Sequence, residues 1–446
     1  MLKKYRDLFF ALCAVSVFLI TASCSQKKAG VYILNFKPEI DEAFWEVAAE
    51  FTKETGIPAK LVTAASGTYE QTLRSEINKL SPPTIFTING PVGYRVWKDN
   101  TLDLSGTQVY EWLLDKNTAI QTKDGVFGIP WTIESYGIIY NDAILRKYFA
   151  LANRANKDIN DASGINNFEK LSRVVKDMQL HLEDLDIQGV FASTSFAPGE
   201  DWRWNTHLAN LPVFYEYRNN NTDDMDTITL PYSGNFKNIF DLYLNNSISP
   251  RKLVGAMTVG DSMSEFALGK VAFVQNGTWS WEQIHNETGN VVKREDIKFL
   301  PVYTGMAGEE KQGLCNGTEN FFAINSKASP EDQAASIKFL EWLFNTPQGR
   351  KAAYEKLQFV APFSTFSEDE IPGDPLVQDM FRRMHSPLYS VSWVFLTFPS
   401  QEFKNVLGSA LLDYSVGNKE WQDVEDTFIQ TWDSEKKALN DQTLSG

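Results

Sequence analysis

The strongest constraint on the fold of this chain is a regular alternation of short β-rich runs with helical segments. Residues 31–36 form the first such run. The segment 39–55 that follows repeats apolar side chains at spacings of four, three and four: Ile40, Phe44, Val47 and Phe51. That spacing is typical of one buried helix face. Two more β-rich runs, at 59–63 and 84–88, enclose a second helical pattern. Because strand, helix, strand order produces βαβ units, we predict an α/β fold with parallel sheets covered by helices.

The rest of the chain repeats this pattern. We expect the second helix to carry Leu73, Ile77 and Leu80. Further along, residues 262–268 predict a helix, 271–275 a strand and 276–279 a loop. Two helix starts have a capping residue followed by proline at the first helical position, Ser329-Pro330 and Thr346-Pro347.

Chain length predicts two lobes. The chain has 446 residues, and single hydrophobic cores stop growing at about 250 to 300 residues. Only Cys315 lies in the folded part, because Cys13 and Cys24 belong to the N-terminal segment described next. An intramolecular disulfide is therefore excluded, and burial of apolar side chains must stabilise the fold.

The N-terminal segment predicts export. Three basic residues (Lys3, Lys4 and Arg6) precede the apolar run 8–20, which is too short to span a bilayer, and small residues follow it. This is the pattern of a secretory signal peptide, which we assign to residues 1–23. No later apolar run is long enough to cross a membrane.

Cys24 follows directly after the predicted cut. That position resembles the lipobox of bacterial lipoproteins, in which the thiol is acylated and the protein is held to a membrane by lipid. The residue three before the cysteine is usually leucine and is Thr21 here. We predict a lipid anchor at Cys24 and a linker over residues 24–30. Ordinary secretion with an incidental cysteine is the alternative.

Net charge excludes two classes of partner. The chain carries −15, and removal of residues 1–23, which hold three basic and one acidic residue, changes this to −17. Nucleic acids and anionic lipid surfaces both need basic patches, so neither is expected to bind.

Motifs for common chemistry are absent from the sequence. It contains no phosphate-binding glycine loop, no G-x-G-x-x-G and no H-E-x-x-H, and its four histidines show no metal-ligand spacing. We therefore expect no cofactor and no metal. The glycine spacing around Cys315 matches a nucleophile elbow. A polar run precedes it where the elbow needs an apolar strand, so we interpret residues 313–317 as a flexible loop without catalysis.

Aromatic residues beside polar groups point to a sugar ligand. Trp131 precedes Glu134, Trp202 and Trp204 follow Glu200, and Trp279 follows Asn276-Gly277. Indole planes cover the C–H faces of sugar rings, while carboxylates and amides bind the hydroxyls. Core packing is the alternative for each tryptophan, and we favour it for Trp45, Trp112 and Trp342. Trp279 differs because it follows a strand at the edge where open α/β sheets place ligands. For Glu134, a salt bridge to a lysine or arginine and contact with a ligand remain equal alternatives.

Four segments, read in order, resemble one family: EIDEAFWEVAAEFTKETG (39–56), GIPWTIESYGIIYN (128–141), FALGKVAFVQNGTWSW (266–281) and FLEWLFNTPQGRKAA (339–353). They are similar to the extracellular solute-binding proteins of carbohydrate ABC importers, family 1, which are maltose-binding-protein-like. The resemblance covers nearly all of residues 31–435. It implies the periplasmic-binding-protein fold, in which several crossovers form a hinge and ligand binds in a cleft between two α/β lobes. The implied lobes are residues 30–141 with 301–361, and residues 142–300 with 362–446.

The resemblance also implies a set of ligand contacts. From the first lobe and the hinge these are Lys37, Glu39, Ser66, Gly67, Thr68, Tyr69, Asn89, Gly90, Trp131 and Glu134. From the second lobe they are Glu200, Trp202, Trp204, Asn276, Gly277, Trp279, Trp393 and Phe398. Asn89-Gly90 departs from maltose-binding protein, which has charged residues in that loop, so the same sugar is not implied.

The implied function is capture of a carbohydrate, such as an oligosaccharide, for delivery to the permease subunits of an ABC importer. The chain would be a monomer without catalysis, outside the cytoplasm and held to the membrane through Cys24. Two alternatives remain: a lipoprotein glycoside hydrolase, which needs two carboxyl groups about 5 to 9.5 Å apart, and a receptor for a non-sugar solute on the same fold.

Overall fold

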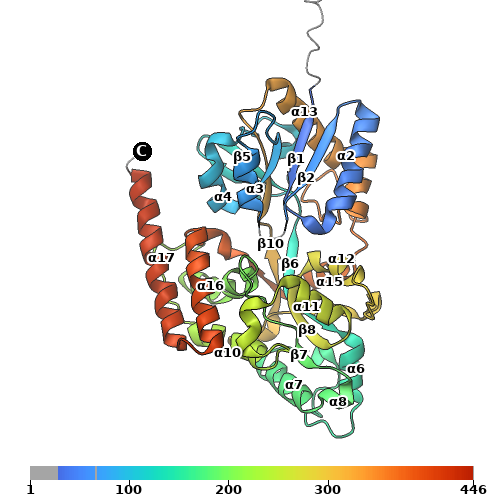
Figure 1. Cartoon of the computed structure of the whole chain (residues 1–446), viewed down its shortest axis with the longest axis vertical. Helices are drawn as coiled ribbons and strands as arrows, with labels where there is room; N and C mark the ends of the chain where they lie inside the picture. The colour runs from blue at the N-terminus through green and yellow to red at the C-terminus, as the bar shows by residue number, and fades with distance from the viewer. Residues whose placement is uncertain (1–28, 66–67, 445–446) are drawn as a thin grey trace, which may run out of the picture.

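The computed structural model describes residues 29–65 and 68–444 and contains two separate β-sheets. Each sheet has helices packed on its faces, and the two resulting lobes lie one above the other in Figure 1. We call the lobe that contains β1 the first lobe and the lobe that contains β7 the second lobe. The predicted α/β class and two-lobed architecture are confirmed.

The first lobe is built on a six-stranded sheet of mixed direction. Its order is β2 (Ala59–Thr63), β1 (Val31–Asn35), β3 (Ile85–Asn89), β11 (Asn320–Ile324), β5 (Gly125–Pro130) and β4 (Ile120–Thr122). The pairs β1–β2 and β1–β3 are parallel, as βαβ units require, and β11 is antiparallel to both of its neighbours. The helices of this lobe are α2 (Asp41–Thr55), α3 (Tyr69–Glu76), α4 (Gly90–Trp97), α5 (Gln108–Trp112), α13 (Pro330–Asn345) and α14 (Pro347–Lys351).

The second lobe has its own sheet. The order is β12 (Tyr389–Ser392), β10 (Gln312–Gly317), β6 (Glu134–Asn141), β8 (Val271–Gly277) and β7 (Gly189–Phe191), and β9 (Ile297–Leu300) also pairs with β6. Its helices are α6 (Asp142–Ala150), α7 (Phe168–Leu180), α8 (Leu182–Leu185), α9 (Asn210–Asn220), α10 (Ser233–Asn245), α11 (Val259–Ala267), α12 (Trp281–His285), α15 (Pro375–Met384), α16 (Gln401–Val416) and α17 (Trp421–Leu444). The last two lie side by side at the left of Figure 1.

The chain passes between the lobes three times, and these passages differ from the boundaries expected from sequence. It leaves the first lobe between β5 and β6, returns between β10 and β11, and leaves again after Phe363, which still packs in the first-lobe core. Residues 134–141 and 301–317 were expected in the first lobe, but β6 and β10 pair within the second sheet. Every residue of β6 is buried. A fully buried strand suits either sheet, so only long-range pairing decides its lobe.

Most predicted elements lie where the sequence placed them. Strands β1, β2 and β3 and helix α2 match within a residue or two, and the side chains of Ser329 and Thr346 cap α13 and α14 as expected. Helix α3, however, ends at Glu76, so Leu80 lies beyond it and is fully exposed. None of the described helices has the length and apolar character needed to cross a membrane.

Three further expectations are corrected by the structure. Strand β8 runs on to Gly277, so Asn276 and Gly277 belong to a strand rather than to a loop. Residues 313–317 form part of β10 instead of a flexible loop, and burial raises the pKa of the Cys315 thiol to about 12. Trp342 is buried as expected, but Trp45 is 63% exposed because it faces outward from α2.

Candidate functional site

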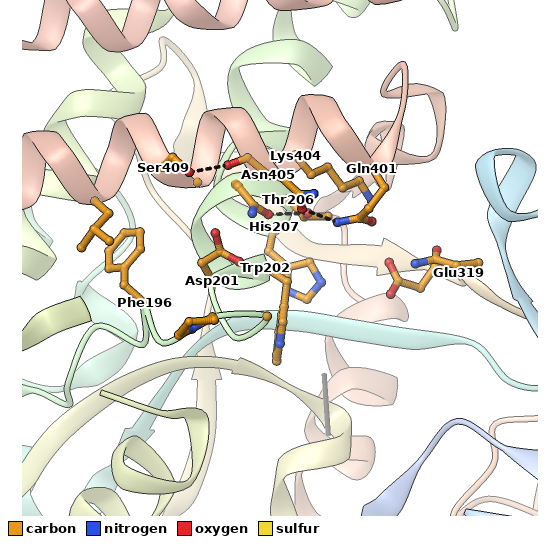
Figure 2. Close-up of a pocket in the computed structure, with 16 residues that line it drawn as sticks. Phe196, Asp201, Trp202, Thr206, His207, Glu319, Gln401, Lys404, Asn405 and Ser409 are labelled. Carbon is orange, nitrogen blue, oxygen red and sulfur yellow. Dashed lines mark hydrogen bonds between the residues drawn. The ribbon is translucent and has the colours of Figure 1, made fainter. Parts of the chain in front are cut away.

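A cavity of about 370 Å³ lies at the junction of the two lobes (Figure 2). Asn89 reaches it from the end of β3 in the first lobe, and Glu319 from the link between β10 and β11. The second lobe supplies the remaining walls. These comprise the loop before residue 203, the following helical turns, and one face of α16. This volume is within the range of small-molecule sites.

One wall of the cavity is a single helix face. Gln401, Lys404, Asn405 and Ser409 project from α16 toward the cavity in Figure 2. Gly408 and Leu412 complete the face, so the lining residues of α16 recur at alternating spacings of three and one. That is the spacing of one helical stripe. The stripe is mainly polar, although the opposite face of α16 packs in the core through Phe403 and Leu407.

The opposite wall is a π-helix at Arg203–Leu208. Such turns are rare and often occur at functional sites, because the wider turn redirects side chains. Here it presents Asn205, Thr206 and His207 to the cavity. The Thr206 hydroxyl donates to Oδ1 of Asn205 over 2.8 Å, and the Asn205 amide in turn hydrogen-bonds the carboxylate of Asp201. The orientation of the Asn205 amide is thereby fixed.

The charged groups of this cavity are poorly solvated. Burial lowers the pKa of Lys404, which is 7% exposed, and the nearby charge of Glu319 only partly offsets that effect. Burial likewise raises the pKa of Glu319, against the opposing charges of Lys404 and Lys37. The pKa of Asp201 is also raised by burial. Buried charges that lack water need a polar partner, which a bound ligand can supply.

His207 is held neutral in the same wall. Its ring stacks on Tyr136 with centroids 4.2 Å apart and planes 2° from parallel. Burial, with smaller contributions from the Arg203 and Lys404 charges, lowers the pKa of His207 well below its usual value. Its Nδ1 atom has no hydrogen-bond partner among the described residues, although the side chain lines the cavity. The Nδ1 atom is itself buried, so a ligand atom reaches it only if the cavity wall moves.

Two indoles separate this cavity from a smaller one. The ring centroids of Trp202 and Trp279 lie 6.1 Å apart at 58°, and both side chains remain partly exposed. Gly277 makes room for Trp279, because a Cβ atom there would lie 2.1 Å from the indole ring. The smaller cavity, of about 30 Å³, is lined by Trp279 together with Lys37, Glu39 and Glu134, among others.

Lys37 forms the charged centre of the smaller cavity. Its Nζ lies 2.5 Å from Oε1 of Glu134 and 3.4 Å from Oε1 of Glu39. Burial alone would lower the pKa of Lys37, but these two carboxylates outweigh it and raise that pKa above its usual range. The ammonium group also lies 6.0 Å from the centroid of the Trp279 ring. Of the two alternatives left open for Glu134, the salt bridge is therefore present.

Six of the residues expected at the ligand site border these two cavities: Lys37, Glu39, Asn89, Glu134, Trp202 and Trp279. Trp131, Tyr69, Trp204 and Phe398 instead lie in the lobe cores, each at most 7% exposed. Trp131, for example, packs edge-on against Phe44 and Phe322.

The other residues expected to contact ligand make contacts within the fold instead. Glu200 accepts from the backbone N–H of Val259 at the start of α11. Asn276 is fully buried and Gly277 lies under Trp279. Gly90 starts α4, and Thr68 donates to the carbonyl of Ala65. Trp393 is buried and packs at a tilt against Tyr136. Ser66, Gly67 and Cys24 lie outside the described residues.

Apart from Asn89 and Trp202, the residues that line the larger cavity were not predicted from the sequence; those with polar or charged side chains include Asp201, Asn205, Thr206, His207, Glu319, Gln401, Lys404 and Asn405. For α16 a signal was available, because its polar residues follow one helical stripe. For the π-helix no sequence signal was available, because its extra residue per turn breaks the periodicity used to find helices. Among the described residues, no group of three or more histidine, cysteine or acidic side chains is arranged to hold a metal ion.

Comparison with known proteins gives consistent results. A family model described as bacterial extracellular solute-binding protein matches residues 46–379. No curated protein matches the sequence. Many solved structures share the fold. The protein RafE in complex with raffinose superposes with a TM-score of 0.69 at 14% identity, covering 91% of this chain and 99% of RafE. A chitin oligosaccharide binding protein gives 0.68 at 15% identity, covering 92% and 99%. A sugar transporter protein from Bacillus licheniformis in complex with stachyose gives 0.65 at 14% identity, covering 91% and 100%.

Proposed function

Because this chain belongs to the bacterial extracellular solute-binding proteins, we propose that it binds a carbohydrate between its lobes and delivers it to an ABC importer. The observation that carries the proposal is the cavity of about 370 Å³ at the lobe junction, which combines an indole face with many hydrogen-bonding groups. Sugars need both, because their rings have apolar C–H faces and a rim of hydroxyls.

The arrangement of the cavity supports a carbohydrate over an apolar solute. Gln401, Asn405, Asn89 and Thr206 offer donors and acceptors, and Trp202 supplies the flat apolar surface. Trp279, with Lys37 and Glu134 beside it, extends the same surface toward the smaller cavity. We infer that these residues contact the ligand. The names of the three similar structures refer to raffinose, a chitin oligosaccharide and stachyose, which favours an oligosaccharide.

The mechanism we infer is a shift in the population of closed lobes. A ligand that touches both lobes binds the closed form more tightly than the open form, so it favours closure by that difference in affinity. The permease would then recognise the closed pair. In this scheme the first lobe comprises residues up to Pro130 with 320–366, and the second lobe comprises the remainder of the mature chain.

We infer that the protein acts outside the cytoplasm, tethered through Cys24 after removal of residues 1–23. A lipid anchor would raise the local concentration of loaded receptor near its permease. Mass spectrometry of the native N-terminus tests this part of the proposal. An N-terminal peptide beginning at another residue, or an unmodified Cys24, would contradict it.

We also infer that the protein binds its sugar without cleaving it. Glycoside hydrolysis needs an acid and a second carboxylate placed across one glycosidic bond. Glu134, one of the two carboxylates that could be suggested, is paired with Lys37, and the other, Glu200, holds the N-terminus of α11. Release of reducing sugar from an oligosaccharide by the purified protein would overturn this inference.

A thermal-shift and calorimetry panel of mono- and oligosaccharides tests the carbohydrate claim, on protein that starts after Cys24. At a ligand concentration about 100 times Kd, binding should add about 2.7 kcal/mol to the free energy of unfolding. Trp202→Ala should reduce this stabilisation to about 1.4 kcal/mol or less at the same ligand concentration, whereas Trp45→Ala, on the exposed face of α2, should retain it. If no sugar shifts the wild-type protein, the proposed function is wrong.

A further inference from the structure

Acidic side chains outnumber basic ones in the two cavities at the lobe junction. The side chains that line them include two ammonium groups, Lys37 and Lys404. They also include six acidic side chains: Glu39, Glu134, Asp201, Glu282, Glu319 and Asp374, of which Asp374 is only partly ionised at neutral pH because burial raises its pKa to about 7. An enclosed region with such an excess of one sign attracts the opposite charge and repels its own. An anionic ligand, such as a uronic acid, is therefore disfavoured here.

Asp201 lacks a cationic partner. Lys37 pairs with Glu39 and Glu134, and the charges of Lys404 and Lys37 act on Glu319. By contrast, none of the ion pairs among the described residues includes Asp201, and its side-chain donor is the neutral amide of Asn205. Burial raises the pKa of Asp201, and only hydrogen bonds from its own backbone N–H and from the Asn205 amide oppose this effect.

The surroundings of Asp201 suit an ammonium group. Asp201 lies between Phe196 and Trp202 in Figure 2, and Glu319 lies on the far side of the cavity. Its Oδ2 approaches α16 so closely that a Cβ atom on Gly408 would lie 1.8 Å from it. A carboxylate beside aromatic rings is a common setting for protonated amines, because both attract positive charge.

A second observation points to a ligand in the same cavity. The side chain of His207 is only 4% exposed, and its Nδ1 has no partner among the described residues. Because the imidazole is neutral, the cavity wall beside it suits a polar, uncharged group such as a hydroxyl. The cavity thus provides for a charged group at Asp201 and for a neutral polar group at His207.

From this arrangement we infer that the ligand is an amino sugar whose protonated amine binds the carboxylate of Asp201. The inference rests on the proposed carbohydrate function and deepens it by naming the class of sugar. The ammonium group would supply the counter-charge that Asp201 lacks, and ring hydroxyls would meet His207 and the polar face of α16. A hydroxyl in place of the amine would leave the excess negative charge uncompensated.

Isothermal titration with three matched sets of sugars tests the inference. Glucosamine and its oligosaccharides carry the amine, the N-acetylated counterparts block it, and the corresponding glucose sugars replace it with a hydroxyl. We expect the amine forms to bind at least about tenfold more tightly than either counterpart, and the advantage to shrink as salt is added. If glucose or N-acetylated sugars bind as tightly as the amines, the inference is wrong and the carbohydrate function stands.

Spermidine tests the other source of a protonated amine, because it has positive charges without a sugar ring. Binding of spermidine in preference to every sugar would overturn both the inference and the proposed function. Binding of no sugar at all would do the same.

Two variants test whether Asp201 is the carboxylate that binds the amine. Asp201→Asn keeps the shape of the side chain, so it should cost the amine sugars about tenfold in affinity and change glucose binding little. Asp413→Asn is the matched control, because that carboxylate is 41% exposed and lies on α16 away from the cavity lining. Gly408→Ala is a second route, since the added methyl displaces Oδ2 of Asp201. Equal affinity for amine sugars in the wild type and both cavity variants would refute the role of Asp201.

Discussion

Lys37 and Glu134 join the two lobes: Lys37 follows β1 of the first sheet, Glu134 begins β6 of the second, and Nζ lies 2.5 Å from Oε1. Both side chains are about nine-tenths buried. Glu39 is a further carboxylate within reach of the same ammonium. A buried pair of this kind is more sensitive to loss of one partner than an exposed pair, because the remaining charge stays out of water.

We therefore expect Glu134→Gln to lower the free energy of unfolding by about 3 kcal/mol. Lys79→Gln, which breaks an exposed pair with Glu76, should cost about 1 kcal/mol or less. Urea denaturation of both variants measures the difference. Equal losses would mean that the Lys37–Glu134 pair contributes no more than a surface ion pair.

Trp202 and Trp204 are close in sequence but differ in surroundings. Their alanine variants should therefore differ in which property they lose, sugar binding or stability. Trp204 is 1% exposed and packs between Phe196 and Phe240, so Trp204→Ala should cost about 3 to 5 kcal/mol of stability. Trp202→Ala should leave most of the stability and weaken sugar binding by about tenfold or more. Denaturation and calorimetry on both variants separate the effects. The reverse pattern would contradict the assignment of Trp202 to the cleft wall.

His207 should make the protein sensitive to acid. Its pKa in the folded state is far below 6.5, so the unfolded state binds the extra proton below that pH. The free energy of unfolding should therefore fall by up to about 1.4 kcal/mol per pH unit as the pH drops below 6.5. His207→Phe keeps a ring against Tyr136 and removes the titration. The free energy of unfolding of the wild type and of His207→Phe, measured from pH 7 to pH 5, isolates this contribution. If the two proteins show the same dependence on pH, the pKa of His207 is not lowered by folding.

The thiol of Cys315 should be inert in the folded protein. It is fully buried on β10 and its pKa is raised to about 12, so little thiolate forms at pH 8. In protein that starts after Cys24, iodoacetamide should label this cysteine only in denaturant. Rapid labelling under native conditions, followed by mass spectrometry, would show that β10 opens readily.

Local sequence patterns predicted much of the fold because the elements concerned are short and regular. Helix α2 shows this well, since its apolar stripe through Phe44, Val47 and Phe51 is buried as the spacing requires. The lobe boundaries could not be predicted in the same way. Strands β6 and β10 are largely buried, and their place depends on partners far away in the sequence.

The candidate site was predictable where charges or indoles stand out against apolar surroundings. Lys37, Glu134 and Trp279 meet that description, and they do come together. Trp204 and Phe398 also follow polar or loop-like sequence, but they fill cores, because an aromatic side chain alone does not reveal which way it points. His207 lies in the π-helix, which leaves no periodic trace in the sequence, and Asp201 lies in the turn just before it.

Glu319 occupies the short link between β10 and β11, one of the three passages between the lobes, and it also lines the larger cavity. The backbone that must rotate when the lobes move therefore carries a side chain that faces the ligand. A hydrogen bond from the ligand to this carboxylate would restrain rotation of the backbone at Glu319. Ligand affinity and hinge stiffness are therefore coupled at a single residue. Substitution of Glu319 would then alter how fast the receptor opens as well as how tightly it holds its cargo.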